Sequence, residues 1–401
     1  MANQCKYYKQ KKQYSLDGGV TWYDVVPSVY QKGELYEYNS EDCNIYLKQY
    51  LTFIPTSGSS TFGWETPSAS TASANTVYYS LDSGSTWISI ASGETVTVGQ
   101  GNKIFWKSSG LTGGIGSFTS TNYFDVEGNI MSLLYGDNFE NQTSLSGKNY
   151  AFFGLFSGCT NVVSAENLAL PATTLANNCY DRMFSGCTSL TTAPTVLPAT
   201  TLTQWCYDCM FANCSSLTTV PELPATKLAS WCYYYMFWGC TSLTTAPELP
   251  ATTLANNCYA GMFYTCTSLT TAPELPATTL AEGCYGYMFC YCTSLTEAPE
   301  LPATTLATYC YYEMFFDCTS LTTAPVLSAT TLAEMCYQSM FEGCTNLNYI
   351  KCLATNISAN NCTTSWVTNV ASNGTFVKDA NMTSWTTGSN GIPTNWTVQN
   401  A

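Results

Sequence analysis

The stretch Cys179-Tyr180-Asp181-Arg182-Met183-Phe184-Ser185-Gly186-Cys187 decides the fold of this chain, because its pattern Cys-Tyr-x-x-Met-Phe-x-x-Cys returns along the sequence. Seven copies lie between Cys179 and Cys344, each followed by Thr or Ser, any residue and Leu. Self-similarity at a fixed period of ~20–50 residues is typical of proteins built from stacked repeats. The period here is 27 residues once and 26 residues thereafter, as the leading cysteines show: Cys179, Cys206, Cys232, Cys258, Cys284, Cys310, Cys336 and Cys362.

Comparing the copies with one another separates two kinds of position. Counted from the first Cys, positions 0, 1, 4, 5 and 8 hardly change, whereas positions 2, 3, 6 and 7 and the residue before the Cys vary. At ~100° per residue on an α-helix, the constant positions form one apolar stripe and the variable positions form the opposite face. The pattern therefore predicts a short amphipathic helix in each copy, with its constant side in the core.

A second constant phrase lies between the predicted helices, Leu-Thr-Thr-Ala-Pro-Glu-Leu-Pro-Ala-Thr-Thr-Leu-Ala at residues 243–255. Threonine is common in strands. Proline lacks the N–H donor that a β-ladder needs, so Pro247 and Pro250 mark turns or strand ends. The Thr-Thr pieces predict short parallel rungs, and stability is then summed over neighbouring copies.

The recurring run Met-Phe-x-x-Cys-Thr-Ser-Leu-Thr resembles the Ala-Phe-x-x-Cys-x-x-Leu pattern of BspA-like leucine-rich repeats, found on bacterial surface adhesins and in proteins of gut bacteriophages. The resemblance covers roughly residues 145–352. It implies an α/β leucine-rich-repeat solenoid with repeats of about 26 residues. The phrases at residues 14–19 and 366–396 also resemble segments that flank such repeats in gut-phage proteins.

Two phrases before the repeats, residues 15–22 and 80–87, fit Ser-x-Asp-x-Gly-x-Thr-Trp. They resemble the Asp-box of sialidase-type propellers, which is a structural hairpin turn. Short alternating runs separated by Gly and Ser predict an all-β region of immunoglobulin-like sandwich size. We therefore expect four regions: an N-terminal β module with an Asp-box-like hairpin and a role in virion attachment, a β-sandwich spacer, the solenoid and a C-terminal cap, at residues 1–48, 49–140, 141–352 and 353–401.

The chain contains 21 cysteines and no histidine. Cysteines in a regular ladder all point the same way, so we expect buried thiols in the stacked core rather than disulfides. The Cys206-Tyr207-Asp208-Cys209 phrase occurs once, without a second pair at zinc spacing, so no metal is expected. A bridge between Cys5 and Cys43 remains open, and no cofactor is expected.

Catalysis is not expected either. The absence of histidine removes the commonest general base and the triads that depend on it. Sialidase chemistry needs several arginines, and Arg182 is the only one. The acids Glu222, Glu248, Glu274 and Glu300 recur at one place per copy, which indicates a solvated stripe rather than a converging acid and base.

Net charge and hydropathy limit the partners and the location that the sequence allows. A net charge of −14 argues against nucleic acid as a partner, because phosphate contacts need clustered Lys and Arg. No apolar N-terminal segment and no stretch of 18 apolar residues is present, so neither a signal peptide nor membrane insertion is expected. This favours a bacteriophage virion component, made in the host cytoplasm as a tail or head fibre, over a bacterial cell-surface adhesin. A purely structural virion decoration protein is a further alternative.

The variable positions carry the functional hypothesis. A solvated face would hold Lys, Glu and Gln, but aromatic residues dominate these positions, and exposed aromatics in a band suggest a recognition surface. We expect this surface to bind a host receptor or glycan, or else to pack against another subunit. The basic N-terminal region would contact other virion proteins, and the assembly would be a homo-oligomer. The candidate ligand-binding residues are Trp205, Trp231, Tyr234, Tyr235, Trp238, Tyr264, Tyr287, Tyr291, Tyr309, Tyr312 and Phe316.

Overall fold

The computed structural model describes residues 46–66, 76–108 and 116–401, together with the backbone of four strands near the N-terminus. These strands form an antiparallel sheet in the order β3-β2-β1-β4. The first Asp-box-like phrase, at residues 15–22, lies outside the described residues, and so does the possible Cys5–Cys43 bridge. The four strands are β1 (Cys5–Tyr8), β2 (Lys11–Tyr14), β3 (Tyr23–Val25) and β4 (Leu35–Tyr38).

Two further β-sheets share an aromatic core. Phe53 packs against Phe62 and Phe118 of the opposite sheet, with ring centroids 5.4 and 4.8 Å apart. Such ring pairs add about 0.5–1.5 kcal/mol beyond the burial of their area. The larger sheet holds β5 (Leu51–Pro55), β7 (Val77–Ser80), β8 (Ile88–Ile90), β10 (Ile104–Ser108), β12 (Phe124–Asn129), β13 (Val162–Ser164) and β14 (Leu168–Ala169), and the smaller holds β6 (Ser60–Glu65), β9 (Thr95–Val98) and β11 (Ser117–Ser120). The β-sheet region before the repeats is as predicted, whereas its immunoglobulin likeness and the domain boundaries stay predictions.

Strand β12 joins this region to the repeats. It pairs antiparallel with β5 on one side and parallel with β13 and β14, which belong to the rod, on the other. Gly128 in β12 has a φ of +83°, and a Cβ added there would lie 2.1 Å from the carbonyl oxygen of Tyr50. Only glycine fits such an approach. The helix α1 (Ser132–Tyr135) and the 3₁₀ turn η1 (Gly136–Asn138) follow β12.

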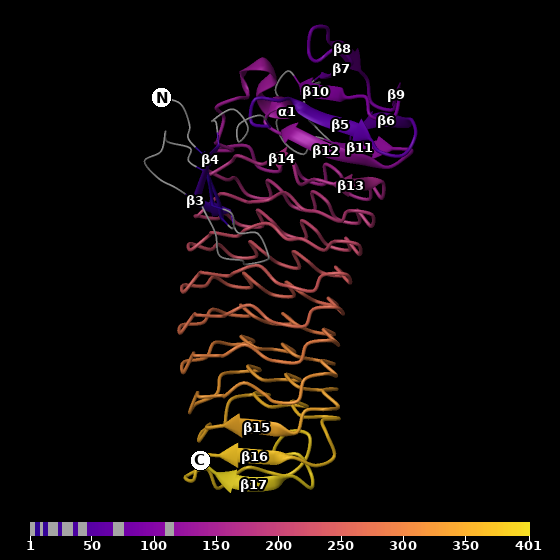
Figure 1. Cartoon of the computed structure of the whole chain (residues 1–401). Helices are drawn as coiled ribbons and strands as arrows, with labels where there is room; N and C mark the ends of the chain where they lie inside the picture. Colours follow the sequence, from indigo (N-terminus) through magenta and orange to yellow (C-terminus); the bar gives the residue numbers. More distant parts are fainter. Residues whose placement is uncertain are drawn as a thin grey trace.

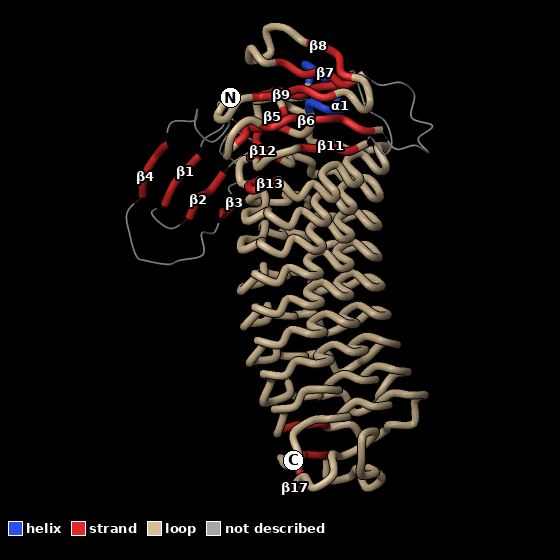
Figure 2. The backbone as a smooth tube through the Cα atoms, turned by 90° about the vertical axis from the view of Figure 1, so that its right-hand side faces the viewer, coloured by secondary structure: helices blue, strands red, loops and turns tan. Residues whose placement is uncertain are grey.

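The repeats stack into a long rod, which Figure 1 shows descending from the sheets to the C-terminus. Its rungs are drawn almost entirely as loops and turns in Figure 2. The helix predicted in each copy is therefore wrong: α1 is the one α-helix among the described residues, and it lies before the rod. The expectation of stacked repeats is confirmed.

Backbone hydrogen bonding explains why no helix forms. The N–H of Met183 donates to the oxygen of Tyr180 in the same copy, whereas the N–H of Phe184 donates to Met210 in the next copy, over 3.2 and 2.8 Å. This alternation continues along the pattern, so odd positions donate to the next rung and even positions donate three residues back. Every rung is thus a chain of tight turns whose remaining backbone groups are satisfied by its neighbours.

Positive φ angles at every fourth residue produce these turns. In the Cys179 copy, Asn178, Arg182 and Gly186 have φ of 57°, 54° and 76°, and the equivalent positions of the other copies behave alike. A residue with positive φ at the third place is what a type II turn requires. Turns of this kind place two residues inside and two outside, which is a period of four. Over nine residues that period buries the same positions as a helix of 3.6 residues per turn, so the burial pattern does not distinguish the two.

The Thr-rich phrases meet in parallel, as predicted, but through single bridges rather than strands. Thr201, Lys227, Thr253, Thr279 and Thr305 occupy equivalent places in five successive copies and are linked in one line of bridges. Pro247 is buried at the end of its run, whereas Pro250 is exposed.

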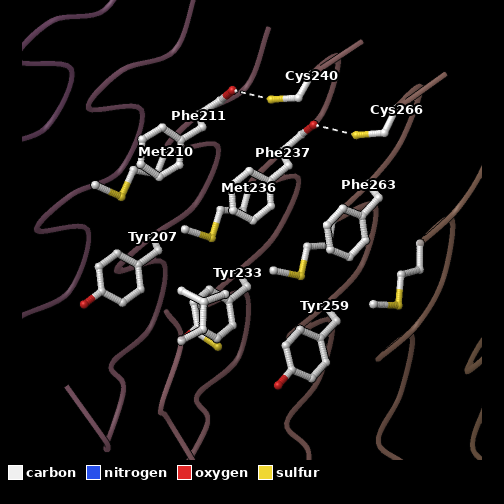
Figure 3. Close-up of a cluster of buried hydrophobic side chains, with 14 of the residues drawn as sticks. Tyr207, Met210, Phe211, Tyr233, Met236, Phe237, Cys240, Tyr259, Phe263 and Cys266 are labelled. Atoms are coloured by element: carbon white, nitrogen blue, oxygen red, sulfur yellow. Dashed lines mark hydrogen bonds between the residues drawn. The ribbon is translucent and has the colours of Figure 1, made fainter. Parts of the chain in front are cut away.

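The constant positions form continuous ladders inside the rod, three copies of which Figure 3 shows. Tyr207, Tyr233 and Tyr259 stack with centroids 5.7 Å apart and rings within 11° of parallel. A second ladder of Phe lies beside it, continued at the start by Phe156. The nineteen cysteines of the described residues are free thiols, which confirms that prediction. The buried cysteine and aromatic ladders are therefore the core of the rod.

Both ends of the rod are covered. Phe152 and Phe156 of a degenerate first copy stack on the first full one. At the other end Trp366 continues the Tyr ladder and is itself stacked by Trp385, with centroids 5.6 Å apart. Phe376 and Trp396 are buried there too, so aromatic side chains cover this end of the rod. Three parallel strands close this end: β15 (Tyr349–Cys352), β16 (Thr375–Lys378) and β17 (Thr397–Asn400).

Candidate recognition surface

The aromatic residues at the variable positions lie on the outside of the rungs; we call these eleven residues the aromatic band. Trp238 and Tyr309 are exposed, at 39% and 37%, and the other nine are half-buried. The constant neighbours of these residues, such as Tyr233 and Tyr311, are buried. The alternation of two inner and two outer residues therefore brings the predicted residues to the surface.

Seven rings of the band form one connected group, which we call the long ring group. Within the Cys232 copy, Tyr235 contacts Tyr234 and Trp238 with centroids 4.5 and 5.7 Å apart. It also reaches Tyr264 in the next copy, at 5.6 Å. The group then continues across two further copies, and its members are Trp231, Tyr234, Tyr235, Trp238, Tyr264, Tyr291 and Phe316.

Three other rings form a second group, the short ring group. Tyr312 contacts Tyr287 at 5.0 Å and Tyr309 at 5.6 Å. Trp205 lies in an earlier copy and belongs to neither group among the described ring contacts. The structure thus brings ten of the eleven predicted residues into two clusters on the outside of successive rungs.

Six band residues have the left-handed backbone conformation. Their φ angles run from 47° at Tyr235 to 63° at Trp231. Such a φ costs a residue with a side chain about 1–2 kcal/mol, whereas glycine and asparagine adopt it readily. The six residues occupy three places of the repeat, and other copies use Asn257 or Gly283 at the first place, Gly261 at the second and Asn213 or Gly239 at the third. The rings at Trp205, Trp231, Tyr235, Tyr287, Tyr291 and Tyr309 are therefore not required by the backbone.

Close packing holds part of the band in place. The ring of Tyr235 lies against Gly261 in the next copy, where an added Cβ would be 2.5 Å from the ring. Burial also raises the pKa of the Tyr264 phenol to about 12. These rings are consequently pre-positioned and neutral near pH 7, with their faces presented at little further entropic cost.

Sequence reasoning missed one acidic residue of this surface, Glu313. It is half-buried at a variable position, follows Tyr312 in the chain, and its backbone oxygen accepts the N–H of Phe316 over 3.2 Å. Burial is the main cause that raises the pKa of its carboxyl group. The only sequence signal was an acid at a position that varies among the copies, and that signal did not reveal its neighbours. The other copies hold Arg182, Cys209, Tyr235, Gly261, Tyr287 and Ser339 there.

A second missed feature is a pair of buried acids, Asp181 and Asp208, at the same position of successive copies. The amide of Asn178 donates to Asp181 over 3.1 Å, and the Arg182 guanidinium lies 3.9 Å from the other carboxylate oxygen. Burial and the neighbouring Asp208 raise the pKa of Asp181 to about 6. By contrast, Glu248, Glu274 and Glu300 are exposed at one place per copy, and Glu222 is half-buried.

The second Asp-box-like phrase forms a hairpin turn between β7 and β8, as the resemblance implied. The Asp82 carboxylate accepts hydrogen bonds from the backbone N–H and the hydroxyl of Thr86, over 2.8 and 2.6 Å, and these contacts lower its pKa to about 2. Gly84 supplies a φ of +87° at the bend. Trp87 packs against Tyr50, with centroids 4.8 Å apart. These groups hold the turn together and do not converge on an open site.

The described residues include neither a metal-ion site nor a membrane-spanning helix. No group of three or more His, Cys, Asp or Glu side chains there is placed to hold a metal ion. Over the same residues, no helix has the length and apolar character needed to cross a membrane.

Comparison with known proteins identifies the repeats. Residues 153–221 and 262–378 match the family described as BspA type Leucine rich repeat region, in six copies. No curated protein and no solved structure matched the chain. The family consists of leucine-rich repeat proteins that are usually non-enzymatic and typically have a surface or binding role. The unmatched residues 222–261 include the Cys232 copy, whose variable positions are the most aromatic, although its backbone bonding continues the rod.

Proposed function

We propose that this chain, whose residues 153–221 and 262–378 match the BspA-type leucine-rich repeat family, is a non-enzymatic recognition protein. It presents the aromatic band to a host-cell receptor or glycan. The observation that carries this proposal is the placement of rings on a strained backbone. Six band residues hold a positive φ, although asparagine or glycine serves at the same place in other copies. Conformational strain of this kind is retained at binding sites, where the contribution of the side chain to binding outweighs the free-energy cost of the backbone conformation.

The form of the band suits recognition. Tyrosine and tryptophan offer large, rigid contact areas with few rotatable bonds, so ordering them on binding costs little. Successive rungs repeat the surface along a stiff rod, and an extended ligand such as a glycan chain would contact several copies at once.

We place this protein on a bacteriophage virion, as a tail or head fibre. The support is the resemblance of the repeats and their flanking phrases to those of gut-phage proteins. In this setting the N-terminal modules attach a homo-oligomer to other virion proteins, and the rod carries the band away from them. A bacterial cell-surface adhesin would use the same band, and a virion decoration protein would not need it.

Binding is tested by replacing Trp231, Tyr235 and Trp238 together with alanine. Central aromatic residues of an interface contribute about 1–2 kcal/mol or more each, so adsorption of the purified protein to host cells should fall at least about tenfold. The matched control is Tyr123→Ala, which removes a ring that is 45% exposed outside the band. Undiminished adsorption by the triple variant, with an unchanged melting temperature, contradicts the recognition role.

The location is tested separately by mass spectrometry and immunogold labelling of purified particles. Recovery at a fixed copy number per particle supports the virion setting. Recovery from the surface of uninfected bacteria supports the adhesin alternative instead. Presence in particles together with normal adsorption of the triple variant indicates a decoration protein.

A further inference from the structure

Glu313 lies where the two ring groups of the aromatic band meet. It follows Tyr312 of the short ring group in the chain, and its backbone oxygen accepts the N–H of Phe316 of the long ring group, over 3.2 Å. In the preceding copy, the N–H of Tyr291 donates to the backbone oxygen of Phe316 and the N–H of Tyr287 donates to that of Tyr312, each over 2.7 Å. One half-buried acid therefore lies next to rings of both groups, which come from two successive copies.

The rings around this carboxylate present faces in different directions. Tyr291 and Phe316 meet at 62° with centroids 5.4 Å apart, and Tyr287 and Tyr312 meet at 67° with centroids 5.0 Å apart. The face of an aromatic ring carries negative charge density and attracts cations within ~6 Å of its centre. Rings at steep angles next to a carboxylate form the kind of surroundings in which an organic cation is held.

The charges of the surrounding rungs also favour a positively charged ligand. Residues 228–350 contain no lysine and no arginine. Within the part of the chain that the structure describes, no basic side chain forms an ion pair with Glu313. A carboxylate that is partly removed from water and not neutralised attracts a positively charged partner. The acids of this segment are Glu248, Glu274, Glu282, Glu297, Glu300, Glu313, Asp317, Glu334 and Glu342.

We propose that Glu313 and the rings of Tyr287, Tyr291, Tyr312 and Phe316 bind a trimethylammonium group of the choline type, carried by a ligand on the host surface. This inference rests on the proposed recognition role and names its ligand chemistry. A metal ion does not suit the site, because the described acids do not converge as metal ligands. A primary ammonium suits it less well, since its three N–H donors each need an acceptor and aromatic ring faces beside a single carboxylate offer few. A trimethylammonium group has no donor and needs only ring faces and a negative charge.

The test is a titration of the full chain with choline chloride, followed by isothermal calorimetry and by tyrosine fluorescence. The matched probe is 3,3-dimethylbutan-1-ol, which has the shape of choline without its charge. We expect saturable binding of choline and at least about tenfold weaker binding of the neutral probe, because a tenfold change corresponds to only ~1.4 kcal/mol.

Variants locate the site. Glu313→Gln keeps the size of the side chain and should weaken choline binding at least about tenfold, an amount within the range of a charge and cation–π contribution. Glu300→Gln removes an exposed acid of the glutamate stripe in a neighbouring rung and should leave the affinity unchanged. Phe316→Leu removes one ring without touching the charge and should weaken binding as well, which keeps the test decisive should Glu313→Gln fail to fold.

Four outcomes overturn the inference: no saturable choline binding, equal binding of the neutral probe, unchanged affinity of a folded Glu313→Gln variant, or tighter binding of N-acetyl-lysine methylamide than of choline. The triple variant at Trp231, Tyr235 and Trp238 changes a different copy. If it abolishes adsorption while choline fails to bind, the recognition role stands and only the ligand chemistry is wrong. Normal adsorption of the triple variant instead contradicts the recognition role, whatever choline does.

Discussion

The thiol of Cys240 donates a hydrogen bond to the backbone carbonyl oxygen of Phe211 in the preceding copy, over 3.2 Å (Figure 3). The same oxygen also accepts the N–H of Cys214, over 3.1 Å, so it has two donors. A thiol is small and is a weak donor, which suits a crowded core. The contact recurs along the rod at Cys187, Cys214, Cys266, Cys292, Cys318 and Cys344.

We predict that the rod thiols resist chemical modification. Burial raises the pKa of the Cys240 thiol well above its ordinary value, and the pKa of the half-buried Cys209 is raised as well. The thiolate is the reactive form. In a variant with Cys5→Ser and Cys43→Ser, Ellman's reagent at pH 8 should leave the native protein unlabelled and label all nineteen remaining cysteines in guanidinium chloride. Rapid labelling of several thiols before unfolding would show that the ladders open.

The second prediction concerns Thr265, which has a φ of 57°. A β-branched residue is strained in this conformation, and the equivalent position holds Gly239 in the preceding copy. Thr265→Gly should therefore leave the unfolding free energy unchanged or raise it by up to about 1 kcal/mol. The melting temperature should accordingly be unchanged or higher. The control is Thr267→Gly, at a position without positive φ, which should lower stability by about 0.5–1 kcal/mol. A large loss at Thr265 would contradict the turn geometry.

The third prediction is a pH dependence caused by Asp181. Burial, aided by Asp208, raises its pKa from 3.8 to about 6. The folded protein then binds this proton more tightly than the unfolded chain, so the unfolding free energy falls as pH rises from about 4 to about 6. Asp181→Asn should remove this part of the dependence and stabilise the protein at pH 7.5 by about 1–2 kcal/mol, allowing for solvent screening.

The measurement for Asp181→Asn is urea unfolding across this pH range. Glu248→Gln, at an exposed acid of the rod, is the control and should change the stability by less than about 0.5 kcal/mol. An Asp181→Asn variant that is less stable than the wild type at pH 7.5 would mean that the charged form is favoured in the folded rod.

The fourth prediction concerns the tyrosine ladder. The hydroxyl of Tyr259 is buried without a hydrogen-bond partner, while its ring stacks on Tyr233 and Tyr285, at 5.7 and 5.9 Å. Tyr259→Phe should be neutral or stabilising by up to about 1 kcal/mol, because an unsatisfied polar group is removed. Tyr259→Ala should cost about 3–5 kcal/mol. If Tyr259→Phe destabilises the rod by more than 1 kcal/mol, the hydroxyl has a structural partner.

Repetition made much of this fold predictable. Because seven copies can be compared, the inner positions of the rod and its free thiols follow from the sequence. The band residues are also visible as variable positions, since outer residues are not held to one identity by the core. Asn178, Gly239 and Gly283 indicate positive φ angles, and the prediction of a helix did not take them into account.

The path of the backbone was decided only by the tertiary structure. Within one copy, a helix and a chain of turns bury the same five positions, and an isolated copy leaves half of its N–H groups without acceptors in the turn form. Only a neighbouring copy supplies those acceptors, as Met210 does for Phe184. The contact of Tyr312, the chain neighbour of Glu313, with Tyr287 of the preceding copy likewise depends on stacking. The sequence by itself determined which side chains face inward, whereas contacts between copies determined the turns and the surroundings of Glu313.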